Sequence, residues 1–326
     1  VASSQFSYMQ MVFGFFVGYL IISRILLPLY YKLEITSIYT YLNQRFGLRS
    51  YKTGSSFFLL SRTIGASFRL YLIASVLQFA IFDAWNIPFA FTVFVTIALI
   101  WTYTYRSGIK TIIWTDALQT TFMLSTVFII AFILMKNLDL DALSLFHVLK
   151  DSDYSQVFFF DDWTDKKYFF KQFFSGVFMA IVMTGLDQDQ MQKNLSCKNL
   201  KDAQKNMFTF SGILIFVDLL FLSLGALLYI YSNKFGIIIP QNPDMLFPNI
   251  AINGGLPPFV GILFIIGIIA AAYSSADSAL TSLTTSFCVD IIEFEKQQAD
   301  KQIKTRKNVH LLMSCILFIV IMIFNA

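Results

Sequence analysis

The stretch PPFVGILFIIGIIAAAYSSADSALTSLTTSFCVDII, residues 257–292, decides the fold class of this chain. It is long enough to cross the roughly 30 Å hydrocarbon core of a bilayer, which takes about 20 helical residues. Its second half nevertheless carries a series of serines and threonines and the carboxylate of Asp277. The stretch therefore predicts a spanning helix whose polar residues have a role inside the membrane.

The rest of the chain has the composition of a membrane protein. Hydrophobic residues make up 56% of the 326 residues and charged residues 13%, against about 25% charged in a soluble domain. Eight apolar runs are long enough to span, and none shows the short alternating segments of a β-barrel. The runs cover residues 8–31, 54–81, 88–105, 111–135, 169–186, 207–232, 257–292 and 310–326. We therefore expect an all-α integral membrane protein with about eight transmembrane helices.

Basic residues are divided unequally between the loops. The loops after the first, third, fifth and seventh runs hold 15 lysines and arginines, whereas the opposite set holds five. The positive-inside rule places the first set in the cytoplasm. We expect a multi-pass protein of the inner (plasma) membrane of a bacterial cell, and we attribute the net charge of +4 to topology rather than to nucleic-acid binding.

The organisation of the chain is simple. Residues 1–326 are expected to form a single transmembrane domain that is incomplete at both ends. Residues 136–167 form a long acidic and aromatic outer loop, in which we predict a short amphipathic helix at the membrane interface. The loop is a lid, an entry vestibule or a solvated connection. Gly14 and Gly18 form a GxxxG motif, which indicates the close approach of another helix.

Several kinds of chemistry are disfavoured. The three cysteines have no CxxC spacing and the two histidines have no partner at ligand spacing, so neither disulfides nor a transition metal are indicated. The motifs HExxH and GxSxG and a paired GxGD-like set do not occur. We expect no enzyme and no cofactor.

Carboxylates inside the bilayer carry most information, because each costs about 2.5–3.5 kcal/mol unless it has a partner, an ion or water. Asp116, in IIWTDALQTT, lies in the inner third of the fourth run, and Asp277 lies deep in the seventh. Around Asp277, small and hydroxyl residues recur at three- and four-residue steps, which places them on one stripe of a helix. The stripe holds Ala271, Ser274, Ser275, Ser278, Thr281, Ser282 and Thr285.

Two interpretations of the stripe compete. In one, small residues allow close packing and the hydroxyls bond to backbone carbonyls one turn back. In the other, the hydroxyls and a facing carboxylate are ligands of a hard cation, which takes several oxygens at short range. A proton relay would instead need carboxylates or histidines in a chain. We favour Na⁺.

Two further positions are candidates for a role in solute binding or gating. Arg69 lies deep in the second run, where no acid on its own helix reaches it; it either holds a substrate carboxylate or pairs with an aspartate or with carbonyls. Asp187 and Gln188, at the inner end of the fifth run, belong either to a solvated helix end or to an inner gate.

Four motifs in order along the chain resemble the sodium:solute symporter family, which includes sodium-coupled sugar, proline, sialic acid and vitamin carriers. They read TSIYTYLNQRFG, SGIKTIIWTDALQT, DQDQMQKNLSCKNLKDAQK and AAYSSADSALTSLTTSFCVDII. The resemblance covers nearly the whole chain. It implies part of the inverted-repeat fold of the leucine transporter, with core helices two to nine present.

The resemblance also implies two ion sites. One sodium site has helix-eight ligands at Ala271 (carbonyl), Ser274 and Ser275, whereas its helix-one ligands are absent. A second site, found in members that couple two sodium ions, falls on Asp116, Ser274 and Ser278. Asp277 stands where the family often has a hydroxyl, and it either strengthens the second site or adds a proton.

The implied function is sodium-coupled import of a small organic solute by alternating access. The asparagine and tyrosine of sugar carriers are replaced by Ala180 and Met183, and the run 207–232 lacks the sugar-binding lysine. With Arg69 and Thr184 as candidate substrate contacts, an organic acid is favoured over a sugar. The alternatives are a proton-coupled transporter of the same fold and a membrane sensor that does not transport.

Overall fold

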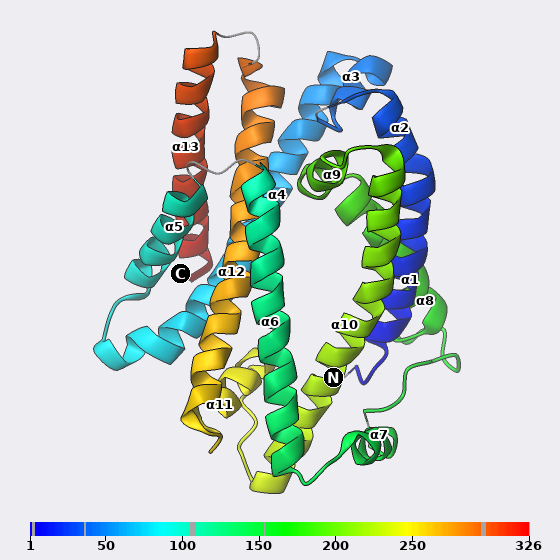
Figure 1. Ribbon diagram of the computed structural model, residues 1–326, viewed down its shortest axis with the longest axis vertical. Coiled ribbons are helices and arrows are strands. Elements are labelled where there is room, and N and C mark those ends of the chain that lie inside the picture. Colours follow the sequence, from blue (N-terminus) through cyan, green and yellow to red (C-terminus); the bar gives the residue numbers. More distant parts are fainter. Residues whose placement is uncertain (2–3, 36, 105–108, 153, 295–297, 326) are drawn as a thin grey trace. The chain divides into compact units, whose positions relative to one another are not determined.

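The computed structural model describes residues 1–326 apart from 2–3, 36, 105–108, 153, 295–297 and 326, and it omits the side chains of residues 103, 109–112, 115, 142, 272–273, 275 and 299. The described part is helical and contains no strand (Figure 1). The elements are α1 (Tyr8–Ile21), η1 (Ile22–Leu26), α2 (Leu27–Lys32), α3 (Thr40–Phe46), α4 (Leu48–Leu77), η2 (Gln78–Phe82), η3 (Asp83–Trp85), α5 (Phe89–Thr104), α6 (Ile109–Asn137), α7 (Ala142–Lys150), α8 (Phe169–Ala180), η4 (Ile181–Gly185), α9 (Gln188–Leu195), α10 (Leu200–Phe235), η5 (Pro243–Met245), α11 (Leu246–Asn253), α12 (Pro258–Ser286), η6 (Phe287–Ile291) and α13 (Ala299–Asn325).

Most of the predicted runs are spanning helices. Within the described residues, six segments are long and apolar enough to cross a membrane, namely Tyr8–Lys32, Leu48–Trp85, Asp116–Asn137, Leu200–Phe235, Pro258–Ile291 and Asp300–Asn325. A seventh, Phe169–Gly185 with Gln188–Leu195, qualifies only as a pair bent by 67°. The remaining run is α5, whose 16 residues reach only about 24 Å. The all-helical membrane fold is confirmed, with six or seven candidate spans among the described residues.

The chain divides into two compact units, which are described separately. Unit 1 comprises residues 1–34 and 125–260, and unit 2 comprises residues 35–124 and 261–326. The boundaries fall inside α6 and within the first turn of α12. Consequently α1, α8 and α10 belong to unit 1, whereas α4, α5, α13 and nearly all of α12 belong to unit 2.

In unit 1, α1 packs closely against α8 because both helices present glycine at the contact. A Cβ atom on Gly14 would lie 2.1 Å from the carbonyl oxygen of Phe173, and one on Gly176 would lie 2.2 Å from that of Met11. Neither position accepts a larger side chain without moving backbone. The prediction that the GxxxG motif admits another helix is confirmed, and that helix is α8.

The fifth span is broken near its inner end. The helix α8 passes into the π-helical turn η4, and the chain then bends before α9 begins at Gln188. The hydroxyl of Tyr30 donates to the carbonyl of Gly185 at 3.0 Å. The hydroxyl of Tyr31 lies 3.2 Å from the carbonyl oxygen of Asn194 and 3.1 Å from that of Cys197. Two tyrosines of α2 thus hold the backbone on both sides of the break.

The outer loop contains the predicted short helix. It is α7, whose N-cap residue Asp141 accepts a hydrogen bond of 2.7 Å from the backbone N–H of Ser144. These hydrogen bonds from Ser144 hold the pKa of Asp141 below its ordinary value. The helix is confirmed, and its service as a lid stays a prediction.

The core of unit 2 is formed by α4, α5, α12 and α13. Small residues such as Ala66, Ala276 and Ala279 are buried at the contacts between these helices and allow larger side chains such as Leu283 and Leu317 to fill the centre. His310 of α13 bridges two neighbours, because its ring nitrogens lie 2.8 Å from Thr104 Oγ1 of α5 and 3.2 Å from Thr284 Oγ1 of α12. The unit therefore provides a well-packed frame for the polar face of α12.

Candidate functional site

The first polar contact lies between α6 and α12, inside unit 2. Ser274 of α12 donates a hydrogen bond through Oγ to Oδ1 of Asp116 on α6. The two residues are 158 positions apart in the sequence, so the fold alone brings them together. The Asp116 side chain is half-buried. The structure therefore places a membrane carboxylate and a hydroxyl of the stripe at one point, as an oxygen-based cation site requires.

Other candidate residues surround this contact on α12. Ser278, one turn further along, is 4% exposed, and its Oγ has no hydrogen-bond partner in the part of the chain that the structure describes. Asp277 is fully buried, and Ala271 is half-buried. The side chain of Ser275 lies outside the described ones.

Two hydroxyls in the last turn and a half of α12 bond to the helix backbone instead. Ser282 Oγ donates to the carbonyl of Ala279 at 3.0 Å, and Thr284 Oγ1 donates to that of Leu280 at 2.6 Å. These are the backbone bonds that the packing interpretation of the stripe predicts. The stripe is thus divided: Ser274 contacts a carboxylate on another helix, whereas Ser282 and Thr284 serve the helix itself.

Asp290, in η6, is a buried carboxylate that the sequence analysis missed. It is fully buried and accepts hydrogen bonds from Tyr51 Oη at 2.8 Å and Ser286 Oγ at 2.6 Å. Lys52 Nζ donates to the backbone oxygen of Asp290 at 2.6 Å and lies 2.7 Å from Glu293 Oε1. This cluster ties the inner end of α12 to the start of α4. The available signal was an aspartate at the end of a long apolar run, four residues after a serine.

The two candidate substrate contacts belong to different units. Arg69 of α4 in unit 2 is exposed, whereas its neighbours Ala66 and Leu70 are in the core. Thr184 of η4 in unit 1 is 8% exposed, and its Oγ1 lies 3.4 Å from the hydroxyl of Tyr19. Each residue is therefore described within its own unit, and their joint role in solute binding stays a prediction.

The candidate gate residues lie at the break of the fifth span. Asp187 is the N-cap of α9 and accepts a hydrogen bond of 3.1 Å from the N–H of Gln190. Gln188 is 1% exposed and Asp189 4%. These two side chains are buried, contrary to the interpretation as a solvated helix end. A role in gating stays a prediction.

Asp218 is a second carboxylate that the sequence analysis missed. It lies in the middle of α10 in unit 1, is half-buried, and has one carboxylate oxygen, Oδ2, without a hydrogen-bond partner among the described residues. It interacts electrostatically with the hydroxyls of Tyr8 and Tyr19 on α1. The available signal was a lone aspartate within the apolar run 207–232.

This chain is a helical membrane protein with a broken span and an oxygen-rich contact between two spans. These are features of the class of secondary transporters. The family model named "Sodium:solute symporter family" matches residues 1–326. The chain belongs to the sodium:solute symporter family, which is a family of transporters.

Known relatives agree with this assignment. A sodium/sialic acid symporter of Aliivibrio fischeri is 28% identical over 292 residues, which are 86% of this chain and 55% of the relative. The sodium-coupled monocarboxylate transporter 1 of Xenopus laevis is 26% identical over 306 residues, which are 89% of this chain and 47% of the relative. The chain spans about half the length of these curated relatives.

A solved structure has the same fold. It shows a Na⁺-coupled sialic acid symporter in a substrate-bound, outward-open state, matched with a TM-score of 0.84 and 21% sequence identity. The match covers 99% of this chain and 72% of the other chain. The expectation of part of a leucine-transporter-like fold is confirmed.

Proposed function

We propose that the full protein is a sodium-coupled symporter that imports a small organic acid by alternating access. The hydrogen bond between Ser274 and Asp116 carries this proposal, because it joins a membrane carboxylate to the hydroxyl stripe. The buried hydroxyl of Ser278, which has no partner among the described residues, supplies a further oxygen on the same face. A carboxylate with several neutral oxygens suits Na⁺ better than it suits a soft metal.

Two ion sites follow from this arrangement. Asp116, Ser274 and Ser278 would hold one sodium ion, with Asp277 beside them on α12. The carbonyl of Ala271 and the hydroxyls of Ser274 and Ser275 would contribute to the other. Ion binding would order α12 and favour the state that accepts solute.

The solute is proposed to be an organic acid. Arg69 places an exposed guanidinium on a spanning helix, and a guanidinium binds a carboxylate through two parallel hydrogen bonds. The relatives named for sialic acid and for monocarboxylates carry acids. Thr184 would add a hydroxyl contact, and Asp187 and Gln188 would form part of the inner gate.

The location and extent of the protein belong to the same proposal. The loop charges and the bacterial relatives support the inner membrane of a bacterium. Residues 1–326 would be one part of a single transport domain, with residues 136–167 on its outer side.

The ion gradient is sufficient for accumulation. Two sodium ions that move down about 100 mV release about 4.6 kcal/mol, and a tenfold gradient adds about 1.4 kcal/mol per ion. The total is roughly 7 kcal/mol, of which about 2.3 kcal/mol is needed to move a monovalent organic anion inward against the same potential. The remaining energy of about 5 kcal/mol supports accumulation of several thousandfold. With one ion the electrical contributions cancel, and the accumulation falls to about tenfold.

The test is uptake by the full-length protein in proteoliposomes. Labelled sialic acid, a monocarboxylate and a neutral sugar are each offered under an inward sodium gradient, with a potassium gradient of equal size as the control. We expect uptake of an acid that requires sodium and ceases when the sodium gradient is collapsed. The Arg69→Gln variant should lose uptake of the acid while the protein stays folded.

Other results would decide against this function. Uptake that persists without sodium and stops with an uncoupler would show a proton-coupled transporter. Binding of an acid without any uptake, under every gradient, would show a sensor.

A further inference from the structure

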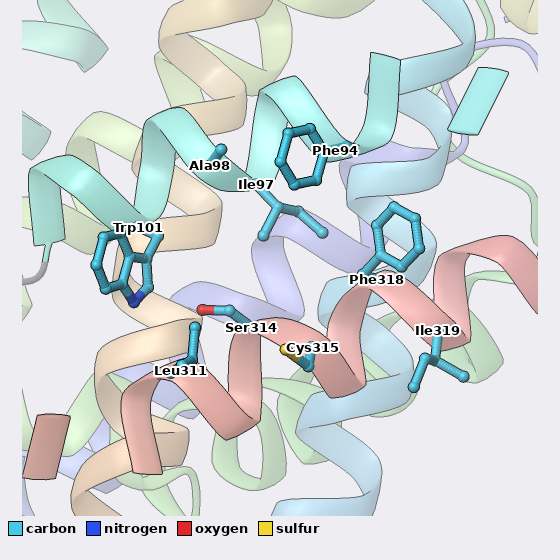
Figure 2. Close-up of a pocket in the computed structure, with 9 residues that line it drawn as sticks. All are labelled: Phe94, Ile97, Ala98, Trp101, Leu311, Ser314, Cys315, Phe318 and Ile319. Atoms are coloured by element: carbon cyan, nitrogen blue, oxygen red, sulfur yellow. The ribbon is translucent and has the colours of Figure 1, made fainter. Parts of the chain in front are cut away.

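A groove of about 460 Å³ lies between α5 and α13, within unit 2 (Figure 2). Phe94 and Trp101 of α5 and Leu311, Cys315 and Phe318 of α13 line it. Phe94 is 59% exposed and Leu311 is 52% exposed, so the groove is open on its outer side. An open apolar groove on the outside of a membrane protein is a surface against which lipid acyl chains can pack.

Positive charge continues this groove along α13. Lys307 and Lys304 precede Leu311 by four and seven residues, so they share its side of the helix. Lys301 lies one turn further, near the same side. Lys301 and Lys304 are exposed, and Lys304 lies about 10 Å along the helix axis from Leu311. Asp300, in the first turn, is the acidic residue on this stripe, so three lysines oppose one carboxylate.

The membrane orientation places these lysines at the cytoplasmic surface. The loop before α13 is one of the strongly basic set, which the positive-inside rule assigns to the cytoplasm. Trp101 lies near the end of α5, and tryptophan favours the depth of the lipid headgroups. The inner leaflet carries anionic lipids that attract basic residues next to a spanning helix. The groove and the lysines thus meet where a phospholipid has its chain and its phosphate.

We propose that the α5–α13 groove binds one anionic phospholipid of the inner leaflet. Its acyl chain fills the groove beside Phe94, Cys315 and Phe318. Its phosphate lies between Lys301 and Lys304, and Lys307 adds positive charge. The lipid would join two of the three helices that pack with α12 in the core of unit 2, so it would stabilise unit 2. This site is independent of the transported solute and of sodium.

The test uses the full-length protein with Trp101 as its one tryptophan, all others being replaced by phenylalanine. The protein is placed in phosphatidylcholine vesicles that contain increasing fractions of brominated phosphatidylglycerol or of brominated phosphatidylcholine. Bromine quenches tryptophan fluorescence at short range, so it reports lipid in the groove. We expect quenching at a lower mole fraction of phosphatidylglycerol than of phosphatidylcholine. Each of Lys301→Gln and Lys304→Gln should reduce that preference about fivefold.

Matched variants separate the site from general surface charge. Lys201→Gln with Lys205→Gln removes two exposed lysines from the same side of the membrane, on α10, and should leave the preference unchanged. Ala98→Phe fills the groove while keeping the lysines, and should reduce quenching by both lipids. Equal quenching by both lipids would overturn the proposal, because the lysines would then select no headgroup. Absence of quenching would also overturn it, because another part of the protein would then cover the groove.

Discussion

The polar stretch at the end of α12 and in η6 has two halves, residues 274–278 and residues 282–290, which treat the same residue types in opposite ways. In the first half, Ser274 donates to Asp116 on another helix, and Ser278 is buried without a partner among the described residues. In the second half, Ser282 bonds to the backbone and Ser286 bonds to Asp290, which also accepts from Tyr51. Hydroxyls and carboxylates recur along the whole helix, so the residue types alone do not separate the halves.

The difference lies in the groups that surround each carboxylate. A buried carboxylate is stable when hydrogen-bond donors replace the water that it loses. Tyr51 of α4 and Ser286 both donate to Asp290, so it needs no ion. Asp116 accepts from Ser274, and the buried hydroxyl of Ser278 adds a further oxygen atom on α12; oxygen atoms of these kinds are the ligands of a hard cation. We infer that the second half of the polar stretch is structural and that the first half binds the ion.

The strongest test of this contrast is Asp290→Ala. The substitution leaves the hydroxyls of Tyr51 and Ser286 without their acceptor, and each buried hydroxyl left without a hydrogen bond costs about 1–3 kcal/mol. We expect a large fall in the melting temperature of the full-length protein in detergent. The fraction that remains folded should keep its sodium affinity.

The control is Asp290→Asn, which retains an acceptor oxygen and should be milder. If Asp290→Ala changed the sodium affinity and left the melting temperature unaltered, the second half of the polar stretch, residues 282–290, would also be an ion site.

The next largest effect is expected from Asp116→Asn. The substitution removes the carboxylate charge of Asp116 from the proposed site, and we expect the apparent sodium affinity of transport to fall about 100-fold, or about 2.7 kcal/mol. Stability without sodium should change little, because the amide oxygen still accepts from Ser274. Uptake measured against sodium concentration provides the readout. Thr121→Val, on the same helix, is the matched control, since Thr121 Oγ1 donates to the carbonyl of Ala117.

The sequence predicted the fold class and the two residues, Asp116 and Ser274, that meet between α6 and α12. Apolar runs and loop charges located the spanning helices, and Asp116 and Ser274 were selected because membrane carboxylates and hydroxyls are costly without a purpose. Their contact depends on how α6 and α12 pack, which no local pattern specifies. The resemblance to a family supplied that pairing before the structure showed it.

Other features could not be found in this way. The break after Gly185 depends on Tyr30, which is 155 residues away in the sequence. Asp290 resembles an ordinary helix-end aspartate until Tyr51 is placed beside it. Serines that bond to the backbone and serines that face another helix have identical sequence signals, so the division of the stripe needed side-chain positions.

A smaller effect is expected from Tyr51→Phe. The substitution removes one hydrogen bond to a buried carboxylate, which contributes about 1.5–3 kcal/mol, while the ring stays in place. Tyr30→Phe is a matched comparison, because its hydroxyl donates to the neutral carbonyl of Gly185, and such a bond contributes about 0.5–1.5 kcal/mol. Melting temperatures of the two variants should fall in that order. Equal shifts would mean that Asp290 has other donors that compensate for Tyr51.

The smallest effect gives the finest comparison, Ser278→Ala against Ser282→Ala. Both residues lie on one helix, one turn apart, and both are almost fully buried. Ser282 already bonds to Ala279, so its loss should leave the sodium affinity unchanged. The hydroxyl of Ser278 has no such bond within the described part of the chain, so Ser278→Ala should lower the affinity about fivefold, as the loss of one ligand of about 1 kcal/mol implies.

Ser278→Ala should affect stability and sodium affinity in opposite directions. A buried hydroxyl without a hydrogen bond costs free energy, so Ser278→Ala should raise the melting temperature slightly when sodium is absent. Sodium stabilises the folded state by a free energy that grows with the logarithm of the ratio of its concentration to its dissociation constant. Because the variant binds sodium less tightly, its melting temperature should rise less on addition of sodium than that of the unaltered protein. If Ser278→Ala lowered the melting temperature without sodium, its hydroxyl would have a structural partner, and the ion site would have to be built from Asp116 and Ser274 without it.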